Sequence, residues 1–141
     1  MKKEILEEIE RKYMEEYKEK NDAERNFFAF TSTNTDISKL KIFVFDIDGI
    51  IFNYYLDTGY NFSDPIQCNI DLINKLHNKG HKIILNTARH DKYRTITIKQ
   101  LKKWAVSYDE LHFGKPQGDF YIDDRGISTD NLRNMLSLGE I

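Results

Sequence analysis

Two short apolar runs, Lys41–Phe45 and Lys82–Asn86, constrain the fold of this 141-residue chain more than any other feature. Uninterrupted apolar runs of this length are typical of strands buried on both faces of a parallel sheet. Between them, apolar residues recur at helical spacing: Ile66, Ile70, Ile73 and Leu76. Asp64 and Pro65 suit the N-cap and the first position of that helix, and Gly80 suits its end. The order strand, helix, strand predicts a parallel βαβ unit.

The rest of the chain continues this alternation of helices and strands. The sequence predicts a helix from about Asp91 to Ala105, followed by short strands at residues 110–113 and 120–123. Ser128 is suited to cap a final helix. Elements in this order predict the α/β class, as a three-layer α/β/α sandwich with a mainly parallel, Rossmann-like sheet.

The first 36 residues differ from the rest of the chain. Residues 1–25 contain no Gly or Pro, and apolar side chains recur every four positions: Ile5, Ile9, Tyr13 and Tyr17. This spacing predicts an extra amphipathic helix with a narrow apolar stripe. We therefore divide the chain into an N-terminal helix and linker, residues 1–36, and an α/β core, residues 37–141. The stripe either packs on the core or makes the helix a contact between the subunits of a homo-oligomer.

Composition and charge exclude several classes of function. The formal net charge of −2 provides no general attraction to nucleic acid or to an anionic membrane surface. No apolar run reaches the length of a membrane span, and the N-terminus lacks the apolar region of a secretory signal. The single cysteine, Cys68, rules out an internal disulfide, which fits a reducing compartment. We expect a soluble cytoplasmic protein without a membrane partner.

Polar side chains follow each predicted strand at its end: Asp46 and Asp48, Thr87 and Arg89, Lys115, and Asp123 and Asp124. In open α/β sheets, ligands bind at the carboxyl ends of the strands, so we expect these side chains at one edge. Several carboxylates at one point repel each other and need a cation. Oxygen ligands suit a hard divalent ion, Mg²⁺ above all, which is often shared with a phosphate. The sequence therefore predicts a site for Mg²⁺ and a phosphate ester.

The spacing of Asp46 and Asp48 indicates how such a site could react. Residues i and i+2 of an extended strand point the same way. One carboxylate can therefore attack phosphorus, forming an aspartyl-phosphate, while its neighbour handles the proton of the leaving group. The alternative interpretation is a strand-end turn with two solvated carboxylates.

Four motifs resemble, in order and spacing, those of the haloacid dehalogenase (HAD) phosphatase superfamily: DIDGI, NTAR, GKP and YIDD. The resemblance covers roughly residues 40–138 and leaves the N-terminal helix outside it. Ile50 stands where the family usually has threonine, which removes a hydroxyl but no carboxylate. The block YDELHFGKPQGDFYIDD is also similar to small bacterial HAD proteins of capsular polysaccharide biosynthesis. The short spacing between motifs implies an HAD-like phosphatase core without a cap domain, and hence an open site.

The resemblance implies a role for each motif residue. Asp46 would be the nucleophile, and Asp48 would be the general acid and then the general base. Thr87 would hold the transferring phosphoryl group, which Lys115 would neutralise while orienting Asp46. The implied Mg²⁺ ligands are Asp46, Asp48, Asp123 and Asp124.

Residues next to these motifs are candidates for substrate contacts: Gly49, Tyr54, Tyr55 and Arg89. Arg89 lies in a locally basic segment, residues 88–104, which either reaches an anionic substrate or forms a solvated helix face. The tyrosines belong to an aromatic loop, residues 53–62, at the place where HAD enzymes carry a mobile flap. Their side chains either line the substrate or pack the hairpin.

These observations favour a Mg²⁺-dependent phosphomonoesterase that acts through an aspartyl-phosphate. The expected substrate is a small phosphorylated metabolite, such as a sugar or polyol phosphate in capsular or surface polysaccharide biosynthesis. One alternative is a polynucleotide 3′-phosphatase, which an open site and the basic segment favour and the acidic net charge opposes. The other is a non-catalytic HAD-like partner of a biosynthetic enzyme.

Overall fold

The computed structural model describes residues 4, 7–8, 11, 39–54, 59–60 and 64–141. The chain divides into two compact units, Met1–Leu40 and Lys41–Ile141. Most of the predicted N-terminal helix lies outside the described residues; the four that are described before residue 39 are helical. The predicted role of this helix as a subunit contact stays a prediction. The fold and the candidate site belong to the second unit.

The second unit is built on a small parallel sheet. Its strands are β1 (Ile42–Phe45), β2 (Lys82–Asn86) and β3 (Glu110–His112), in the order β1-β2-β3. The register places Phe45 beside Leu85, so β1 and β2 end close to the same edge. The predicted α/β class with a parallel sheet is confirmed, and β2 has the bounds that its apolar run predicts.

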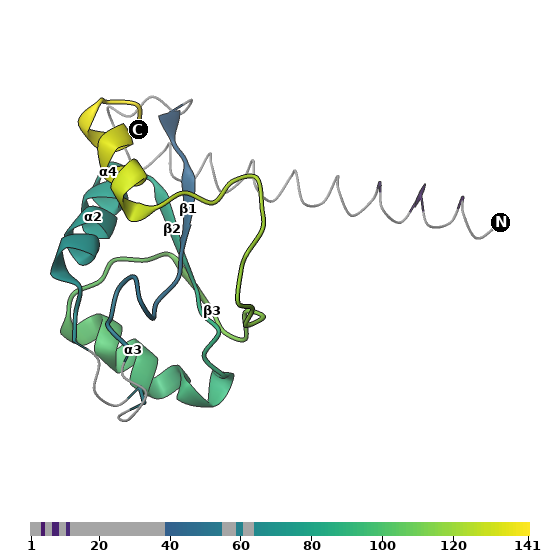
Figure 1. Ribbon diagram of the computed structural model, residues 1–141, viewed down its shortest axis with the longest axis vertical. Helices are drawn as coiled ribbons and strands as arrows, with labels where there is room; N and C mark the ends of the chain where they lie inside the picture. The colour runs from purple at the N-terminus through teal and green to yellow at the C-terminus, as the bar shows by residue number, and fades with distance from the viewer. Residues whose placement is uncertain (1–3, 5–6, 9–10, 12–38, 55–58, 61–63) are drawn as a thin grey trace. The chain divides into compact units, whose positions relative to one another are not determined.

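Three described helices accompany this sheet, together with a short 3₁₀ turn, η2 (Asp91–Tyr93). α2 (Gln67–Asn78) connects β1 to β2, α3 (Arg94–Lys103) connects β2 to β3, and α4 (Thr129–Ser137) ends the chain. The helices lie on one side of the strands, and the connection from β3 to α4 runs past their other side (Figure 1). Within the described residues, no helix has both the length and the apolar character needed to cross a bilayer.

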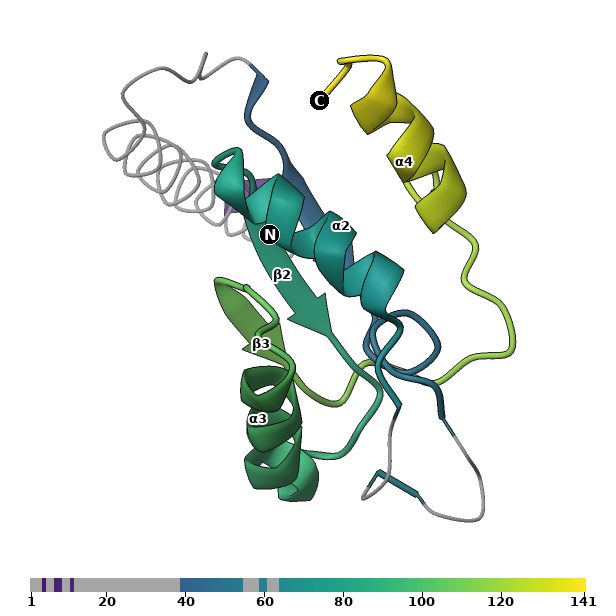
Figure 2. The same ribbon diagram turned by 90° about the vertical axis from the view of Figure 1, so that its left-hand side faces the viewer.

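α4 lies beside α2 at the C-terminal end of the chain (Figure 2). The Arg133 guanidinium donates to the Asn69 side chain near the start of α2. The Lys79 ammonium, just beyond the end of α2, donates to the Ile141 carbonyl at 2.6 Å. Leu132 of α4 is buried as a member of the hydrophobic core. As predicted, α4 is capped by Ser128, whose hydroxyl accepts a hydrogen bond from the Asn131 backbone N–H at 3.1 Å.

The hydrophobic core lies between α2 and the sheet. Its fully buried members come from the turn after β1, from α2, from β2 and from α3: Ile47, Ile51, Phe52, Ile70, Ile73, Leu76, Ile83, Leu85 and Leu101. The prediction that β1 is buried on both faces is wrong. Phe45 is buried, but Ile42 and Val44, which point to the other face, are 40% and 61% exposed. Because the described helices cover one face of the sheet, the second apolar face of β1 remains open.

The predicted start of α2 is also wrong. The helix begins at Gln67 rather than at Pro65. Asp64 and Pro65 instead run beside the segment after β1: the Asn53 N–H donates to the Asp64 carbonyl at 2.9 Å, and Pro65 forms a bridge with Phe52. The predicted end is confirmed, since the chain leaves the helix at Gly80 with a φ of +95° that only glycine adopts without strain.

The predicted strand at residues 120–123 is not formed. Phe120 and Ile122 are 86% and 97% exposed. The Tyr121 hydroxyl donates to the Pro116 carbonyl at 2.7 Å, which folds the segment back on itself. An apolar sequence favours a strand only where a neighbouring strand is present to pair with it. The predicted helix at 91–105 is found as η2 and α3, which ends at Lys103.

Candidate active site

The candidate site begins with the turn that follows β1. Ile47 is fully buried, and its carbonyl accepts hydrogen bonds from Ile51 N–H at 2.8 Å and Phe52 N–H at 3.2 Å. Gly49 has a φ of +87°, a conformation that a residue with a Cβ adopts only at a cost. This tight turn anchors Ile47 in the core and leaves Asp46 and Asp48 half-buried on either side of it.

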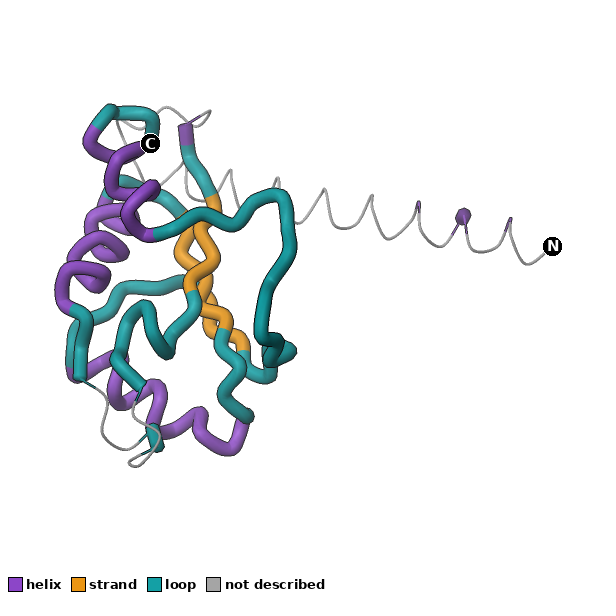
Figure 3. Tube along the Cα trace, in the orientation of Figure 1, coloured by secondary structure: helices purple, strands orange, loops and turns teal. Residues whose placement is uncertain are grey.

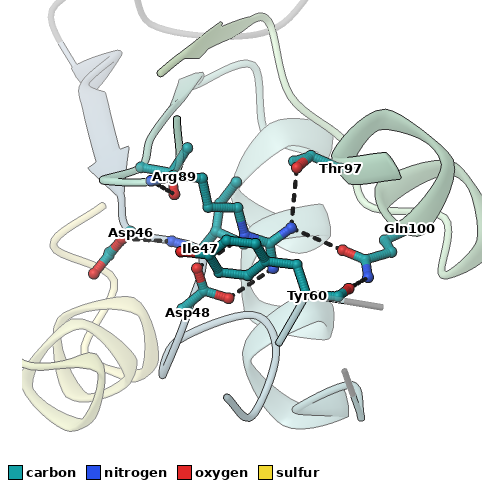
Figure 4. Close-up of polar contacts among 8 residues, drawn as sticks. Asp46, Ile47, Asp48, Tyr60, Arg89, Thr97 and Gln100 are labelled. Carbon is teal, nitrogen blue, oxygen red and sulfur yellow. Dashed lines mark hydrogen bonds and ion pairs between the residues drawn. The ribbon is translucent and has the colours of Figure 1, made fainter. Parts of the chain in front are cut away.

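Asp48 is held by Arg89, which follows β2 (Figure 4). The guanidinium donates from Nε to Oδ2 at 2.9 Å and from Nη2 to Oδ1 at 2.6 Å. The Arg89 side chain is completely buried, and that of Asp48 is 21% exposed. A two-point contact of this kind fixes the carboxylate in one orientation as well as neutralising it.

The remaining donors of Arg89 are bound by α3. Nη1 donates to Thr97 Oγ1 at 3.0 Å and to Gln100 Oε1 at 2.8 Å. The Tyr60 ring covers the guanidinium, with 4.3 Å between Cζ and the ring centroid, and the Gln100 amide donates to the Tyr60 carbonyl. The sequence makes Arg89 a candidate for a substrate contact, whereas the structure places it inside the protein as the partner of Asp48.

Thr97 and Gln100 are not among the site residues predicted from the sequence. A signal was available, because Thr97 lies one helical turn before the apolar Leu101 in the same predicted helix. A polar side chain on the buried face of a helix needs a partner, and Arg89 supplies it.

Asp46 is in a different situation from Asp48. Its Oδ1 accepts a hydrogen bond from the Ile47 N–H at 2.8 Å, and among the described residues no side chain bonds to it. Burial raises the pKa of Asp46, and the charge of Asp48 adds to this; the Ile47 N–H, Lys115 and Arg89 act in the opposite direction. Asp46 is therefore a carboxylate with electron pairs that remain available at the end of a strand.

The backbones of Thr87 and Lys115 are hydrogen-bonded to each other just beyond the carboxyl end of β2. The Thr87 N–H donates to the His112 carbonyl, and the Lys115 N–H donates to the Thr87 carbonyl, both at 2.9 Å. The Thr87 side chain is fully buried, and its hydroxyl accepts from the Arg89 N–H at 3.1 Å. The Lys115 ammonium lies 4.0 Å from the Tyr121 ring centroid. The structure thus brings Thr87 and Lys115 together with the ends of β1 and β2.

Asp123 and Asp124 are exposed and belong to the connection from β3 to α4. Asp123 Oδ1 accepts from the Arg125 N–H at 2.8 Å and from the Gly126 N–H at 2.5 Å. These two hydrogen bonds lower the pKa of Asp123, and the charge of Lys115 contributes a smaller effect. Asp123 is therefore occupied in capping a turn of its own segment.

The predicted Mg²⁺ site is not assembled by this arrangement. Within the described part of the chain, no three His, Cys, Asp or Glu side chains lie close enough to hold a metal ion. Both oxygens of Asp48 bind Arg89, and Asp123 faces its own backbone. The four acidic side chains have the right chemistry for Mg²⁺, but the described structure does not bring three of them together. The metal site stays a prediction.

The structure gives contacts inside the protein to the remaining described candidates for substrate contacts. The Gly49 N–H donates to the Phe52 carbonyl at 2.7 Å, so it is already used inside the turn. Tyr54 is 42% exposed, and its ring centroid lies 5.4 Å from that of Tyr60. Tyr60 in turn contacts the Tyr93 ring at 4.7 Å. Tyr55 lies outside the described residues. The described tyrosines pack on each other and on Arg89, next to Asp48.

Comparison with known proteins supports the fold. No family model matches the chain, and no curated protein shows a significant match. A crystal structure of a target protein from Vibrio cholerae is similar, with a TM-score of 0.53, 24% sequence identity, and coverage of 71% of this chain and 99% of that chain.

Two structures of the Pnkp1/Rnl/Hen1 complex, one described as an RNA repair complex, give TM-scores of 0.49 with 23% and 24% identity. Each match covers 77% of this chain but only 37% and 34% of the other chain. At identities below 25%, the match to the Vibrio cholerae protein establishes that the two chains share a fold.

Proposed function

We propose that this chain is a phosphomonoesterase that transfers the phosphoryl group of its substrate first to Asp46 and then to water. The different surroundings of the two carboxylates after β1 carry this proposal. Among the described residues Asp46 has no side-chain partner, whereas Asp48 is fixed at both oxygens by Arg89. A nucleophile needs available electron pairs, and the group that moves protons beside it needs a fixed orientation. The order of the four HAD-like motifs supports the same reading.

The proposed reaction has two steps. In the first, an Asp46 oxygen bonds to phosphorus while the bond from phosphorus to the leaving oxygen breaks, and Asp48 gives its proton to that oxygen. In the second, Asp48 takes a proton from water, the water oxygen bonds to phosphorus, and the bond to Asp46 breaks. Inorganic phosphate is released and Asp46 is restored. Lys115, whose charge already acts on Asp46, would balance the negative charge of the phosphoryl group.

Arg89 is a positioning residue in this scheme. It acts through Asp48, because its own side chain is completely buried. Because Arg89 fixes Asp48 in one orientation, the proton of the first step is delivered from one position, and a leaving group that needs no proton depends less on it. Aryl phosphates should react faster than alkyl phosphates.

We further propose that Mg²⁺ assists the reaction and that the substrate is a small phosphorylated metabolite. The similarity of residues 108–124 to capsular polysaccharide proteins supports a sugar or polyol phosphate. The second candidate is the 3′-phosphate end of a polynucleotide. Exposed cations on the outer face of α3 favour it: Lys99, Lys102 and Lys103. The net charge of −2 opposes it, because nucleic-acid binding relies on a broad basic surface.

Phosphate release from a panel of compounds tests the proposal. The panel holds sugar phosphates, polyol phosphates, nucleoside monophosphates, a 3′-phosphorylated oligonucleotide and p-nitrophenyl phosphate, each with and without Mg²⁺. The matched control is Asp46→Asn, which keeps the size of the side chain but removes the nucleophile. Release that disappears in Asp46→Asn supports the proposal and ranks the substrates. Equal release by both proteins, or none from any compound, would count against it and favour a non-catalytic partner.

A further inference from the structure

Tyr60 lies over the buried partner of Asp48, and the proposed reaction gives it no role. Its ring centroid is 4.3 Å from Arg89 Cζ, so the ring covers one face of the guanidinium (Figure 4). Two further rings contact it: that of Tyr93 at 4.7 Å, with 72° between the ring planes, and that of Tyr54 at 5.4 Å. The Tyr60 ring is thereby packed between Arg89 and two other aromatic side chains.

The backbone of Tyr60 is linked to the same arginine through one side chain, that of Gln100. The Gln100 amide donates to the Tyr60 carbonyl, and Gln100 Oε1 accepts from Arg89 Nη1 at 2.8 Å. The donor and the acceptor belong to one planar amide group, so their positions are fixed relative to each other. Tyr60 and Arg89 are therefore joined by two separate contacts, the ring face and the Gln100 amide.

The surroundings of this pair strengthen the contact between the ring and the cation. The Arg89 side chain is completely buried, and the attraction between a cation and a ring is larger where water is excluded. Four other cations among the described residues lie over rings, and all are at least partly exposed: Lys92, Arg94, Lys103 and Lys115. Burial, followed by the charge of Asp48, raises the pKa of Tyr60, so the phenol remains uncharged over the guanidinium.

The position of Tyr60 on Arg89 affects how Asp48 is held. The guanidinium is planar, and its Nε and Nη2 both donate to the Asp48 carboxylate, so a tilt of that plane would lengthen at least one of the two bonds. α3, part of the helical stretch at the foot of the view in Figure 3, binds the guanidinium through Thr97 and Gln100. These bonds act at one end of the guanidinium, whereas the Tyr60 ring lies on its face and opposes a tilt.

We propose that Tyr60 is a positioning residue for proton transfer by Asp48, and that it acts through Arg89. The ring keeps the plane of the guanidinium aligned with the carboxylate, and Gln100 keeps the ring in place. The contact between Tyr60 and Arg89 stands on the structure alone, whereas its consequence for the reaction rests on the proposed function. This role differs from both expectations for the aromatic loop, because the Tyr60 ring acts on Arg89 rather than on the substrate or the hairpin.

The Arg89 Nε–H group, which donates to Asp48, allows a test of the contact without any activity. NMR follows this proton, and the backbone signals of the strands show that each variant is folded. Tyr60→Leu should shift the signal, because the field of the ring is lost, and should make the proton exchange with water about tenfold faster. Tyr60→Phe keeps the ring and should leave both unchanged. A signal with the same position and exchange rate in Tyr60→Leu would overturn the contact.

Dependence on the leaving group tests the role of Tyr60 in the reaction. The ratio kcat/KM reports the steps up to release of the leaving group, which is where Asp48 gives its proton. In Tyr60→Leu, kcat/KM should fall about tenfold for the alkyl phosphate that the panel ranks first, but less than about threefold for p-nitrophenyl phosphate, whose leaving group needs no proton. Tyr60→Phe should keep both values near those of the wild type. A merely structural role of Tyr60 would lower both by the same factor.

Two further variants separate this role from a general loss of packing. Gln100→Met removes the amide link, so it should change the alkyl-to-aryl ratio of kcat/KM in the same direction. Combined with Tyr60→Leu it should add less than its own effect, because both act through Arg89. Phe113→Leu is the matched control. It removes a ring whose centroid lies 4.6 Å from Arg94 Cζ, but the Arg94 side chain is 50% exposed, so the ratio should not change.

The two tests distinguish a failure of this role from a failure of the proposed function. Equal losses for both substrates in Tyr60→Leu, or an equal change of the ratio in Phe113→Leu, would overturn the positioning role. A shifted Arg89 signal in Tyr60→Leu, together with no phosphatase activity in the wild-type chain, would instead reject the proposed function and with it any role of Tyr60 in proton transfer. The contact between the Tyr60 ring and Arg89 would then still stand.

Discussion

Replacing Arg89 by methionine should destabilise the protein strongly, because the guanidinium is buried and its partner is a carboxylate. The change leaves the Asp48 charge without either of its two hydrogen bonds. Removing one member of a buried ion pair costs about 3–5 kcal/mol. Since Asp48 is 21% exposed, water can reach part of it, and we expect the lower end of that range, about 3 kcal/mol. A domain of this size has a total stability of only about 5–15 kcal/mol.

Urea denaturation at neutral pH measures this cost, and a double variant tests its cause. Asp48→Asn combined with Arg89→Met removes the unpaired charge, so it should be more stable than Arg89→Met alone. Arg94→Met is the matched control, because Arg94 pairs with Asp91 while both side chains are at least half exposed. That change should cost less than about 1 kcal/mol. A loss of under about 1 kcal/mol in Arg89→Met, or no recovery in the double variant, would refute the reasoning.

Three further predictions concern single side chains. Asp48→Asn should lose less activity towards p-nitrophenyl phosphate than towards an alkyl phosphate, as steady-state rates will show, because a good leaving group needs no proton. Asp46→Asn should raise the free energy of unfolding at neutral pH by about 1 kcal/mol. The reason is that the pKa of Asp46 is raised in the folded protein, so its ionised form opposes folding. Below pH 3.8 the carboxyl group is protonated, and urea titrations should no longer show this gain. Burial, Lys79 and Lys41 lower the pKa of His81 below 6.5, so stability should fall as the pH drops below that value, and His81→Gln should flatten this dependence.

Local signals in the sequence predicted much of the fold. β2 was predictable because five consecutive residues that suit a buried strand need no knowledge of the rest of the chain. Ser128 was predictable because an N-cap acts within one turn of its own helix. The start of α2 was not, because Asp64 and Pro65 pair with the segment after β1, and a propensity for helix capping does not include that competing contact.

The site was predictable where residue type decides the chemistry and not where contacts decide it. Asp46 and Asp48 were identified from their place after an apolar run. The role of Arg89 was not, because its partner Asp48 is 41 residues away in the sequence and nothing local distinguishes a buried arginine from one that faces solvent. The segment 120–123 shows the same limit, since its sequence indicates a strand but not whether a neighbouring strand is present to pair with it.

Direct detection of the phosphorylated enzyme tests the proposed role of Asp46 as the nucleophile most directly. Asp48→Asn slows the second step, so it should accumulate the intermediate when p-nitrophenyl phosphate and Mg²⁺ are added and the reaction is stopped with acid. Mass spectrometry should find one phosphoryl group on the peptide containing Asp46, and none when Asp46→Asn is added to the same variant. Phosphate release with no phosphoryl adduct, or an adduct on a different residue, would contradict the role of Asp46 as the nucleophile.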